Sequence, residues 1–149
     1  MKELDLAGIA LMEKAGSAVA KKAAAMCDGG RIGVICGKGN NGGDGYACAD
    51  TLKIMGIESQ VISPEPVDSL AGDSKHFHSL CQESGLDISH GITADEVDLN
   101  VFDLLVDGLL GTGITGDVRP QSSAWIETVN HAETKRLSID IPSGVNATD

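Results

Sequence analysis

Basic residues are scarce in this sequence, and long hydrophobic runs are missing from it. The 149 residues hold 11 Lys and Arg against 22 Asp and Glu, which gives a net charge of −11. Nucleic acids and anionic membranes attract basic surfaces, so neither is expected as a partner. No segment reaches the ~18 apolar residues that span a bilayer, and the first residues lack the pattern of a signal peptide. We therefore expect a cytoplasmic protein.

Closely spaced cysteine pairs are also missing. The four cysteines, Cys27, Cys36, Cys48 and Cys81, include no Cys-x-x-Cys pair, and Cys36 lies inside an apolar run. Zinc and redox sites are typically marked by such pairs. We expect four separate reduced thiols, as in a cytosolic protein.

Glycine, in contrast, is abundant. There are 19 glycines in the chain, nearly twice the usual share of ~7%. They follow no Gly-X-Y repeat, which excludes a collagen-like chain, and a content of 42% apolar residues argues against disorder. The glycines cluster in loops after apolar runs, where ligand-binding turns lie.

The spacing of apolar residues predicts helices that alternate with strands. Helices are expected over 4–27, 44–55, 67–84 and 121–131, with a helical turn at 94–97, and strands over 31–36, 57–63, 86–92, 101–107 and 136–141. This alternation is typical of a single α/β domain with a parallel sheet and helices on both of its faces.

Three of the predicted strands end in polar, glycine-rich sequences. These are Gly-Lys-Gly-Asn-Asn-Gly-Gly-Asp-Gly at 37–45, Asp-Gly-Leu-Leu-Gly-Thr-Gly-Ile-Thr-Gly-Asp at 107–117, and Asp-Ile-Pro-Ser-Gly at 140–144. In an open parallel sheet, ligands bind outside the carboxyl ends of the strands. We therefore expect the three loops to form one site at the same edge of the sheet.

The glycines of the first loop match the G-x-G-x-x-G pattern, in its required place between a strand and a helix. Glycine allows the backbone to approach a ligand and to adopt positive φ, and free N–H groups at the helix start can face a pyrophosphate. Asn40, Asn41 and Asp44 distinguish the loop from the ordinary dinucleotide fingerprint. The alternative is a simple turn in which Asp44 caps the following helix.

The second and third loops each carry an aspartate at or next to a strand end. Asp107 would be costly there unless it pairs or ligates a cation, and the flexible backbone that follows, with Thr112 and Thr115, can form an anion nest. Asp140 lies between Ile139 and Ile141, an apolar setting that should raise its pKa toward the range useful for acid–base catalysis. The alternatives are a solvated connection for the second loop and a turn-capping role for Asp140.

Together these motifs resemble the YjeF N-terminal domain, the NAD(P)H-hydrate epimerase family. The resemblance rests on the segments 37–45, 106–113 and 140–144 and on Leu-Met-Glu-Lys-Ala-Gly at 11–16, and it extends in the same order along residues 1 to 149. It implies a Rossmann-like, three-layer α/β/α sandwich. The implied activity is interconversion of the R and S forms of hydrated NADH and NADPH, assisted by potassium, in the repair of damaged nucleotides.

The resemblance also implies roles for individual residues. Asn41, Asp107 and Ser143 would ligate potassium, an oxygen-only set that suits a hard cation, and Asp140 would be the general acid or base. The residues implied to hold the nucleotide are Asn40, Asn41, Gly42, Gly43, Asp44, Gly111, Thr112, Gly113, Ile114, Thr115, Gly116, Asp117 and Asp140.

Further expectations concern partners and extent. The implied substrate is a small-molecule dinucleotide, and members of this family form homodimers or are fused to an ADP-dependent dehydratase. Their domains continue past Asp-Ile-Pro-Ser-Gly, so we expect residues 1–149 to be a single domain, either truncated after residue 149 or naturally short.

Two other functions fit the same fold. A non-catalytic nucleotide-binding or scaffold domain would have lost the motif residues, but here they are all present. A dehydrogenase would need an acidic residue at the end of the second strand, where Glu65 is the one candidate.

Among the remaining residues, His76 and His78 are too close in sequence to share a helix face. We expect His90 and His131 at the surface, and Trp125 and Ile126 on the buried side of their helix.

Overall fold

The computed structural model describes residues 6–27, 29–37, 39–64, 66, 68, 70, 72–109 and 120–139. Its helices are α1 (Leu6–Met26), α2 (Gly39–Ile54), α3 (Gly72–Glu83) and α4 (Pro120–His131), with two short 3-10 turns, η2 (Ala94–Glu96) and η3 (Leu99–Val101). The strands are β1 (Ile32–Cys36), β2 (Ser59–Ser63), β3 (Asp87–His90), β4 (Leu104–Gly108) and β5 (Lys135–Ser138).

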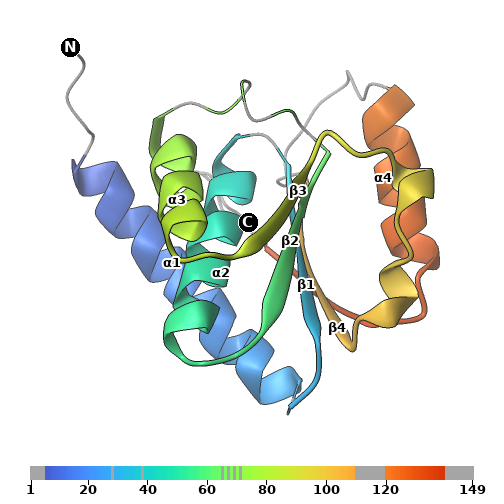
Figure 1. Cartoon of the computed structure of the whole chain (residues 1–149), viewed down its shortest axis with the longest axis horizontal. Coiled ribbons are helices and arrows are strands. Elements are labelled where there is room, and N and C mark those ends of the chain that lie inside the picture. The colour runs from blue at the N-terminus through green and yellow to red at the C-terminus, as the bar shows by residue number, and fades with distance from the viewer. Residues whose placement is uncertain are drawn as a thin grey trace, which may run out of the picture.

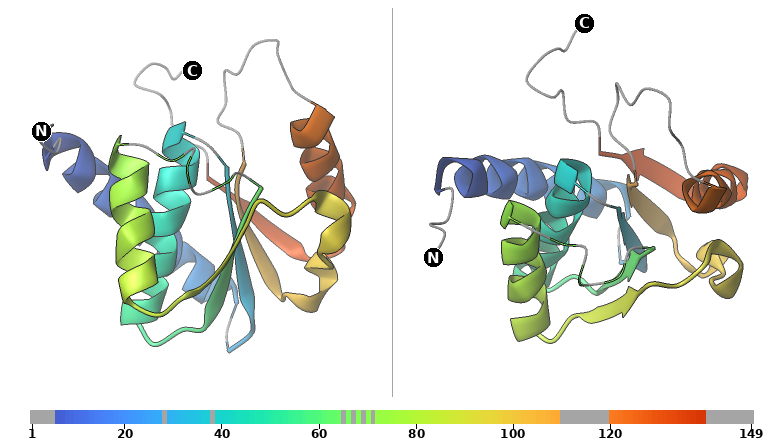
Figure 2. Two further views of the ribbon diagram at one scale, coloured as in Figure 1. Left: turned by 45° about the horizontal axis from the view of Figure 1, so that its top comes forward. Right: turned by 90° about the horizontal axis from the view of Figure 1, so that it is seen from above.

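The five strands form one parallel sheet in the order β3-β2-β1-β4-β5. From β1 the chain moves outward to β2 and β3, and then crosses to the other side of β1 to form β4 and β5. Helices α1, α2 and α3 cover one face of the sheet, while α4 lies on the other (Figures 1 and 2). The predicted α/β sandwich with a parallel sheet is therefore confirmed.

The central strands are buried on both faces. Ile32 and Val34 of β1 belong to the core under α1–α3, and Ile35 belongs to the core under α4; all three are fully buried. A buried side chain of this size stabilises the fold by about 1.5–3 kcal/mol. This two-sided burial explains why the strand is an unbroken apolar run. On α4, Trp125 is buried and Ile126 packs against the same core, as predicted.

Several predicted boundaries are wrong, and the helix predicted over 67–84 begins only at Gly72. Helix α2 begins at Gly39, five residues before the predicted start. Strand β4 begins at Leu104 rather than at residue 101, because residues 99–101 form the turn η3. The side chain of Asp98 accepts a hydrogen bond from the N–H of Asn100 and so favours the turn over an extended backbone.

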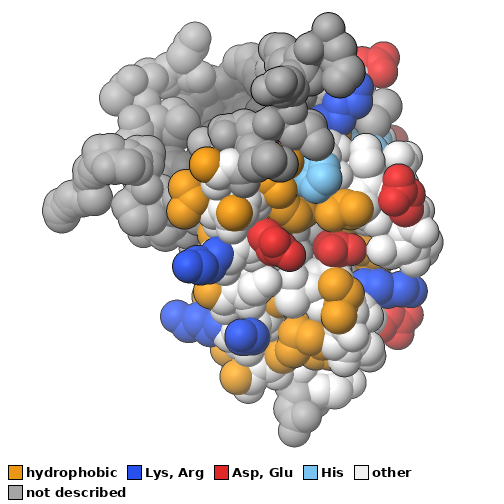
Figure 3. Space-filling view, turned by 90° about the vertical axis from the view of Figure 1, so that its left-hand side faces the viewer, with side chains coloured by type: hydrophobic (Ala, Val, Ile, Leu, Met, Phe, Trp, Pro, Cys, Tyr) orange, Lys and Arg blue, Asp and Glu red, His pale blue; other side chains and the backbone are white. Residues whose placement is uncertain are grey.

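The surface of the protein carries both acidic and basic side chains. Acidic, basic and hydrophobic side chains are interspersed on the face that α1 and α3 present (Figure 3). Leu11 and Ile54 are large apolar side chains that are mainly exposed, at 70% and 77%, but isolated residues of this kind are normal.

In the described part of the chain, every helix is too short or too polar to cross a bilayer. All four cysteines are free and buried.

Helices α1 and α2 pack closely at Gly16. A Cβ atom built there would lie 2.8 Å from the backbone of Ala47 and of Cys48. We expect Gly16→Ala to destabilise the fold by about 1–3 kcal/mol through overpacking, even though Ala is the better helix former by ~1 kcal/mol. Urea unfolding followed by circular dichroism measures the difference. Ala18→Gly, at an exposed position of α1, should cost only the propensity difference of ~1 kcal/mol. A Gly16→Ala protein more stable than wild type would contradict the close packing.

Candidate functional site

The ends of three neighbouring strands meet at one edge of the sheet. The N–H of Gly37, just after β1, donates to the carbonyl of Gly108 at the end of β4, with 3.0 Å between N and O. On the other side of β4, Asp107 lies opposite Ser138 of β5, and the N–H of Ile139 donates to the carbonyl of Asp107 at 2.9 Å. The segments that were predicted to carry chemistry therefore leave the sheet from adjacent strands, β1, β4 and β5.

This edge contains the topological switch point of the sheet. Helix α2 follows β1 on one face, and α4 lies on the opposite face beyond β4, so the chain diverges between β1 and β4 (Figure 2). Crevices at such points are where open α/β sheets bind ligands. Both the first glycine-rich segment and Asp107 lie beside this point.

The first glycine-rich segment is the start of α2 rather than a loop before it. Because α2 begins at Gly39, its positive dipole end and the first N–H groups, which have no partner within the helix, lie at the carboxyl end of β1, where they favour an anion. Asp44 is inside the helix, so the alternative that it caps the helix is wrong. Glycine and asparagine are poor helix formers, and sequence propensity therefore placed the start too late.

Close packing explains the glycines at this helix start. A Cβ atom on Gly42 would collide with the carbonyl oxygen of Gly37, and one on Gly43 would lie 2.6 Å from both Met12 Sδ and Ser74 Oγ. Neither glycine has positive φ, so it is the lack of space, not the backbone conformation, that requires glycine at these two positions. Gly42 instead allows the close helix–strand approach typical of the third glycine of the dinucleotide fingerprint.

Asp44 is a buried carboxyl group next to this turn. It is only 3% exposed, and burial raises its pKa to about 7. Near neutral pH such a group can hold or release a proton, which is the property that acid–base chemistry needs. The sequence indicated Asp44 as a nucleotide contact, but no local pattern indicated its burial.

Asp107 is a carboxylate at the switch point. It is half-buried, and its Oδ1 accepts a hydrogen bond of 3.1 Å from the N–H of Leu109. A carboxylate removed from water at a strand end is stabilised by a cation, and oxygen ligands suit a hard cation such as potassium. The described donor chemistry is thus compatible with the potassium site that the family resemblance implies.

The other predicted site residues are only partly visible. Asn40 and Asn41 lie in the first turn of α2, but their side chains are outside the described residues. Gly111 to Asp117, Asp140 and Ser143 also lie outside them. Among the residues that are described, no group of three or more His, Cys, Asp or Glu side chains could hold a metal ion.

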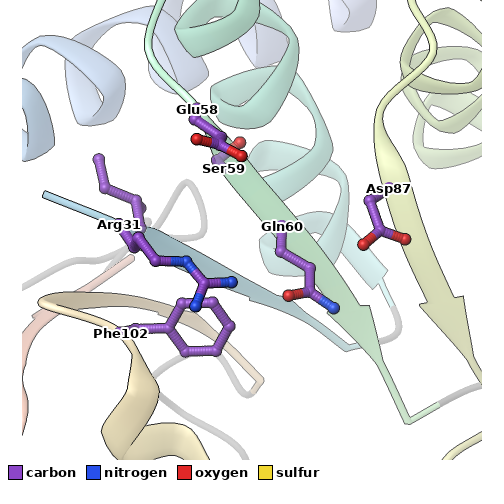
Figure 4. Close-up of a pocket in the computed structure, with 7 residues that line it drawn as sticks. Arg31, Glu58, Ser59, Gln60, Asp87 and Phe102 are labelled. Atoms are coloured by element: carbon purple, nitrogen blue, oxygen red, sulfur yellow. The ribbon is translucent and has the colours of Figure 1, made fainter.

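A separate hollow of about 70 Å³ lies at the opposite edge, near the amino ends of β1, β2 and β3 (Figure 4). The Arg31 guanidinium lies over the Phe102 ring, 5.3 Å from its centroid, and the buried Ser59 hydroxyl has no hydrogen-bond partner in the described part of the chain. The polar and charged residues of its lining are Arg31, Glu58, Ser59, Gln60 and Asp87. None of the predicted site residues belongs to this hollow.

Comparison with known proteins gives consistent matches. The family described as "YjeF-related protein N-terminus" matches residues 8–149. The NAD(P)H-hydrate epimerase of Rhodopirellula baltica is 33% identical over 147 residues, which cover 98% of this chain and 60% of that protein. The bifunctional NAD(P)H-hydrate repair enzyme Nnr of Methanothermobacter thermautotrophicus is 37% identical over 144 residues, which cover 93% of this chain and 28% of that protein.

A solved structure supports the same fold. The crystal structure of the yeast protein ynu0 (YNL200c) superposes with a TM-score of 0.75 at 24% identity, and the match covers 90% of this chain and 60% of that one. At this level of identity the similarity concerns the fold alone. The chain spans less than two thirds of the length of the relatives described here.

The buried Asp44 makes stability depend on pH. Its pKa is raised, so the folded protein favours the neutral form and loses stability as pH rises from about 4 through 7. Asp44→Asn removes the loss of stability that ionisation of this buried carboxyl causes. We expect the stability of the variant relative to wild type to increase by roughly 2–3 kcal/mol between pH 5 and pH 8, as measured by urea unfolding at each pH. Asp87→Asn, at an exposed position at the start of β3, is the matched control and should show little change. A pH-independent difference for Asp44→Asn would contradict the raised pKa.

Proposed function

The chain belongs to the family of YjeF-related protein N-termini, and from that premise we propose that it interconverts the R and S forms of hydrated NADH and NADPH. The proposal makes it an isomerase, an NAD(P)H-hydrate epimerase acting in nucleotide repair. Relatives that carry this name are 33% identical over nearly the whole chain. Its substrate would be a small-molecule dinucleotide.

The adjacency of the three motif-bearing strand ends is the observation that carries this proposal. The Gly37–Gly108 hydrogen bond joins β1 to β4, and the Ile139–Asp107 hydrogen bond joins the end of β5 to β4. A dinucleotide placed across this edge would meet the start of α2, whose N–H groups suit its phosphates. Ile139, whose N–H donates to the carbonyl of Asp107, directly precedes Asp140 in the sequence.

Potassium would be held by oxygen atoms of Asn41, Asp107 and Ser143. When bound, the ion would supply a fixed positive charge beside oxygen atoms of the substrate. Asp107 supports this assignment because its carboxylate is half-buried at the switch point. The backbone of Asn41 lies in the first turn of α2, at the end of the neighbouring strand β1.

Asp140 is our candidate for the general acid and base. Changing R into S requires the bond between carbon and the hydroxyl oxygen to break and to form again on the other side of the ring. Asp140 would give a proton to the departing oxygen, which leaves as water. It would take a proton back from water when the bond re-forms, so no co-reactant is consumed. A positioned carboxyl group contributes typically 10²–10⁴-fold to such a step. The nucleotide itself would be held by the residues 40–44 and 111–117.

Compartment and partners complete the proposal. Four free, buried cysteines fit a reducing compartment such as the cytoplasm. Some relatives are named as bifunctional Nnr repair enzymes, and we propose that a fused dehydratase is compatible with this chain as well. The homodimer and the extent of the domain, 1–149, stay predictions.

Substitution of the two aspartates tests the proposal. We expect Asp140→Asn to slow interconversion of the R and S hydrates by about 10²–10⁴-fold, because an amide cannot exchange the proton. Asp107→Asn should instead raise the potassium concentration that gives half-maximal rate, because it removes a charged ligand. Chromatographic separation of the two hydrates over time, at varied potassium, measures both effects.

Asp87→Asn is the control, because it makes the same chemical change at an exposed position at the amino end of β3. It should behave as wild type. Full turnover by Asp140→Asn would remove this residue from the mechanism. Binding of the hydrates by the wild-type chain without any interconversion in potassium would support the alternative, a non-catalytic nucleotide-binding domain.

A further inference from the structure

Two histidines from different elements meet between α3 and the edge strand β3. The Nε2 atoms of His78 and His90 lie 2.7 Å apart, with the ring centroids 4.7 Å apart and the ring planes tilted by 55°. His78 is only 2% exposed and His90 is half-buried. The expectation of a surface position for His90 is therefore wrong, because the fold places it against α3.

The contact depends on the number of protons that the pair carries. A hydrogen bond between two Nε2 atoms needs one N–H donor and one lone pair. A neutral pair and a singly protonated pair both satisfy this requirement. When both rings are protonated, two N–H groups and two positive charges face each other, and the bond is lost.

The described groups that surround His78 do not neutralise a second positive charge. From α2, the ring of Tyr46 meets His78 edge-on, with centroids 5.3 Å apart. From α3, the thiol of Cys81 donates to the Tyr46 carbonyl, and burial raises the pKa of Cys81 to about 12, so this thiol stays neutral. The nearby carboxylate on α2, Asp50, acts on Cys81 and accepts a hydrogen bond from Ser84.

Among the described strand residues, the one opposite His90 is not ionisable. Ser63 of β2 lies opposite His90 in the register, and its carbonyl accepts from the N–H of Gly91 at 2.9 Å. The charged residue of β3, Asp87, is at the other end of the strand. On α3 itself, the ring of His76 packs against Phe77 instead of joining the pair.

We propose that His78 and His90 form a pH-operated clasp that fastens the edge strand β3 to α3. The clasp is closed while at least one ring is neutral, and acid opens it by protonating both. Nothing in the proposed enzymatic reaction requires this pair, so the clasp is independent of that function.

The sign of the pH dependence follows from the surroundings. Burial and the neighbouring His90 lower the pKa of His78 below its usual value. The folded protein therefore takes up this proton less readily than the unfolded chain, in which the pKa of histidine is ~6.5. The stabilisation is complete above about pH 6.5 and is lost as the pH falls below that value toward the lowered pKa.

Thermal unfolding of the whole chain at pH 7.5, 6.5 and 5.5 tests the clasp. Between pH 7.5 and 5.5 we expect the Tm of wild type to fall by about 2–4 °C more than that of the double variant His78→Gln/His90→Gln. His76→Gln, on the same helix but outside the pair, should keep the wild-type pH dependence. An equal fall in Tm for wild type and the double variant would overturn the proposal.

Nitrogen NMR of the histidine rings in wild type gives a second test, which does not depend on the variants folding. The clasp predicts a coupled titration of His78 and His90, with the second proton taken up well below the usual histidine pKa of ~6.5. Two independent titrations near pH 6.5 would overturn it. A Tm that rises with zinc and falls again with EDTA would also overturn it, because the pair would then be a metal site. Neither measurement uses nucleotide, so the outcome is separate from that of the epimerase assay.

Discussion

The lack of space for a side chain at the start of α2 is the constraint on which the rest of the site depends. Gly42 faces the carbonyl of Gly37, and Gly43 faces Met12 and Ser74. Only hydrogen atoms fit between the helix and its neighbours there, so α2 can begin directly at the end of β1. This start directs the N–H groups of the helix to the switch point between β1 and β4, where an anionic ligand would gain most from them.

Two carboxyl groups share this region but differ in their surroundings. Asp44 is buried inside α2 and its pKa is raised to about 7, whereas Asp107 is half-buried and bonded to the backbone of its own strand end. A buried carboxyl without a compensating charge weakens the fold. Costs of this kind are typical of functional sites, which trade stability for a useful charge or proton. Carboxylate oxygen suits a hard cation, and in the proposed site the phosphates would be left to the N–H groups at the start of α2.

Much of the architecture could be predicted because it is encoded locally. The apolar runs of β1 and β4 are buried on both faces of the sheet, and such runs are typical of parallel strands. The common edge of the three motifs follows from the direction of parallel strands. The start of α2 at Gly39 could not be predicted, because its residues have low helix propensity. The side chains that pack closely against Gly43, those of Met12 and Ser74, also lie far away in the chain.

The sequence by itself determined the order of helices and strands, the direction of the sheet and the family, since these depend on apolar periodicity and on contiguous motifs. Only the tertiary structure decided that Asp44 is buried and that His78 meets His90. The physical reason is that burial and side-chain pairing depend on which surfaces pack together. A local pattern says that a histidine follows a strand, but only the packing of α3 on that strand supplies its partner.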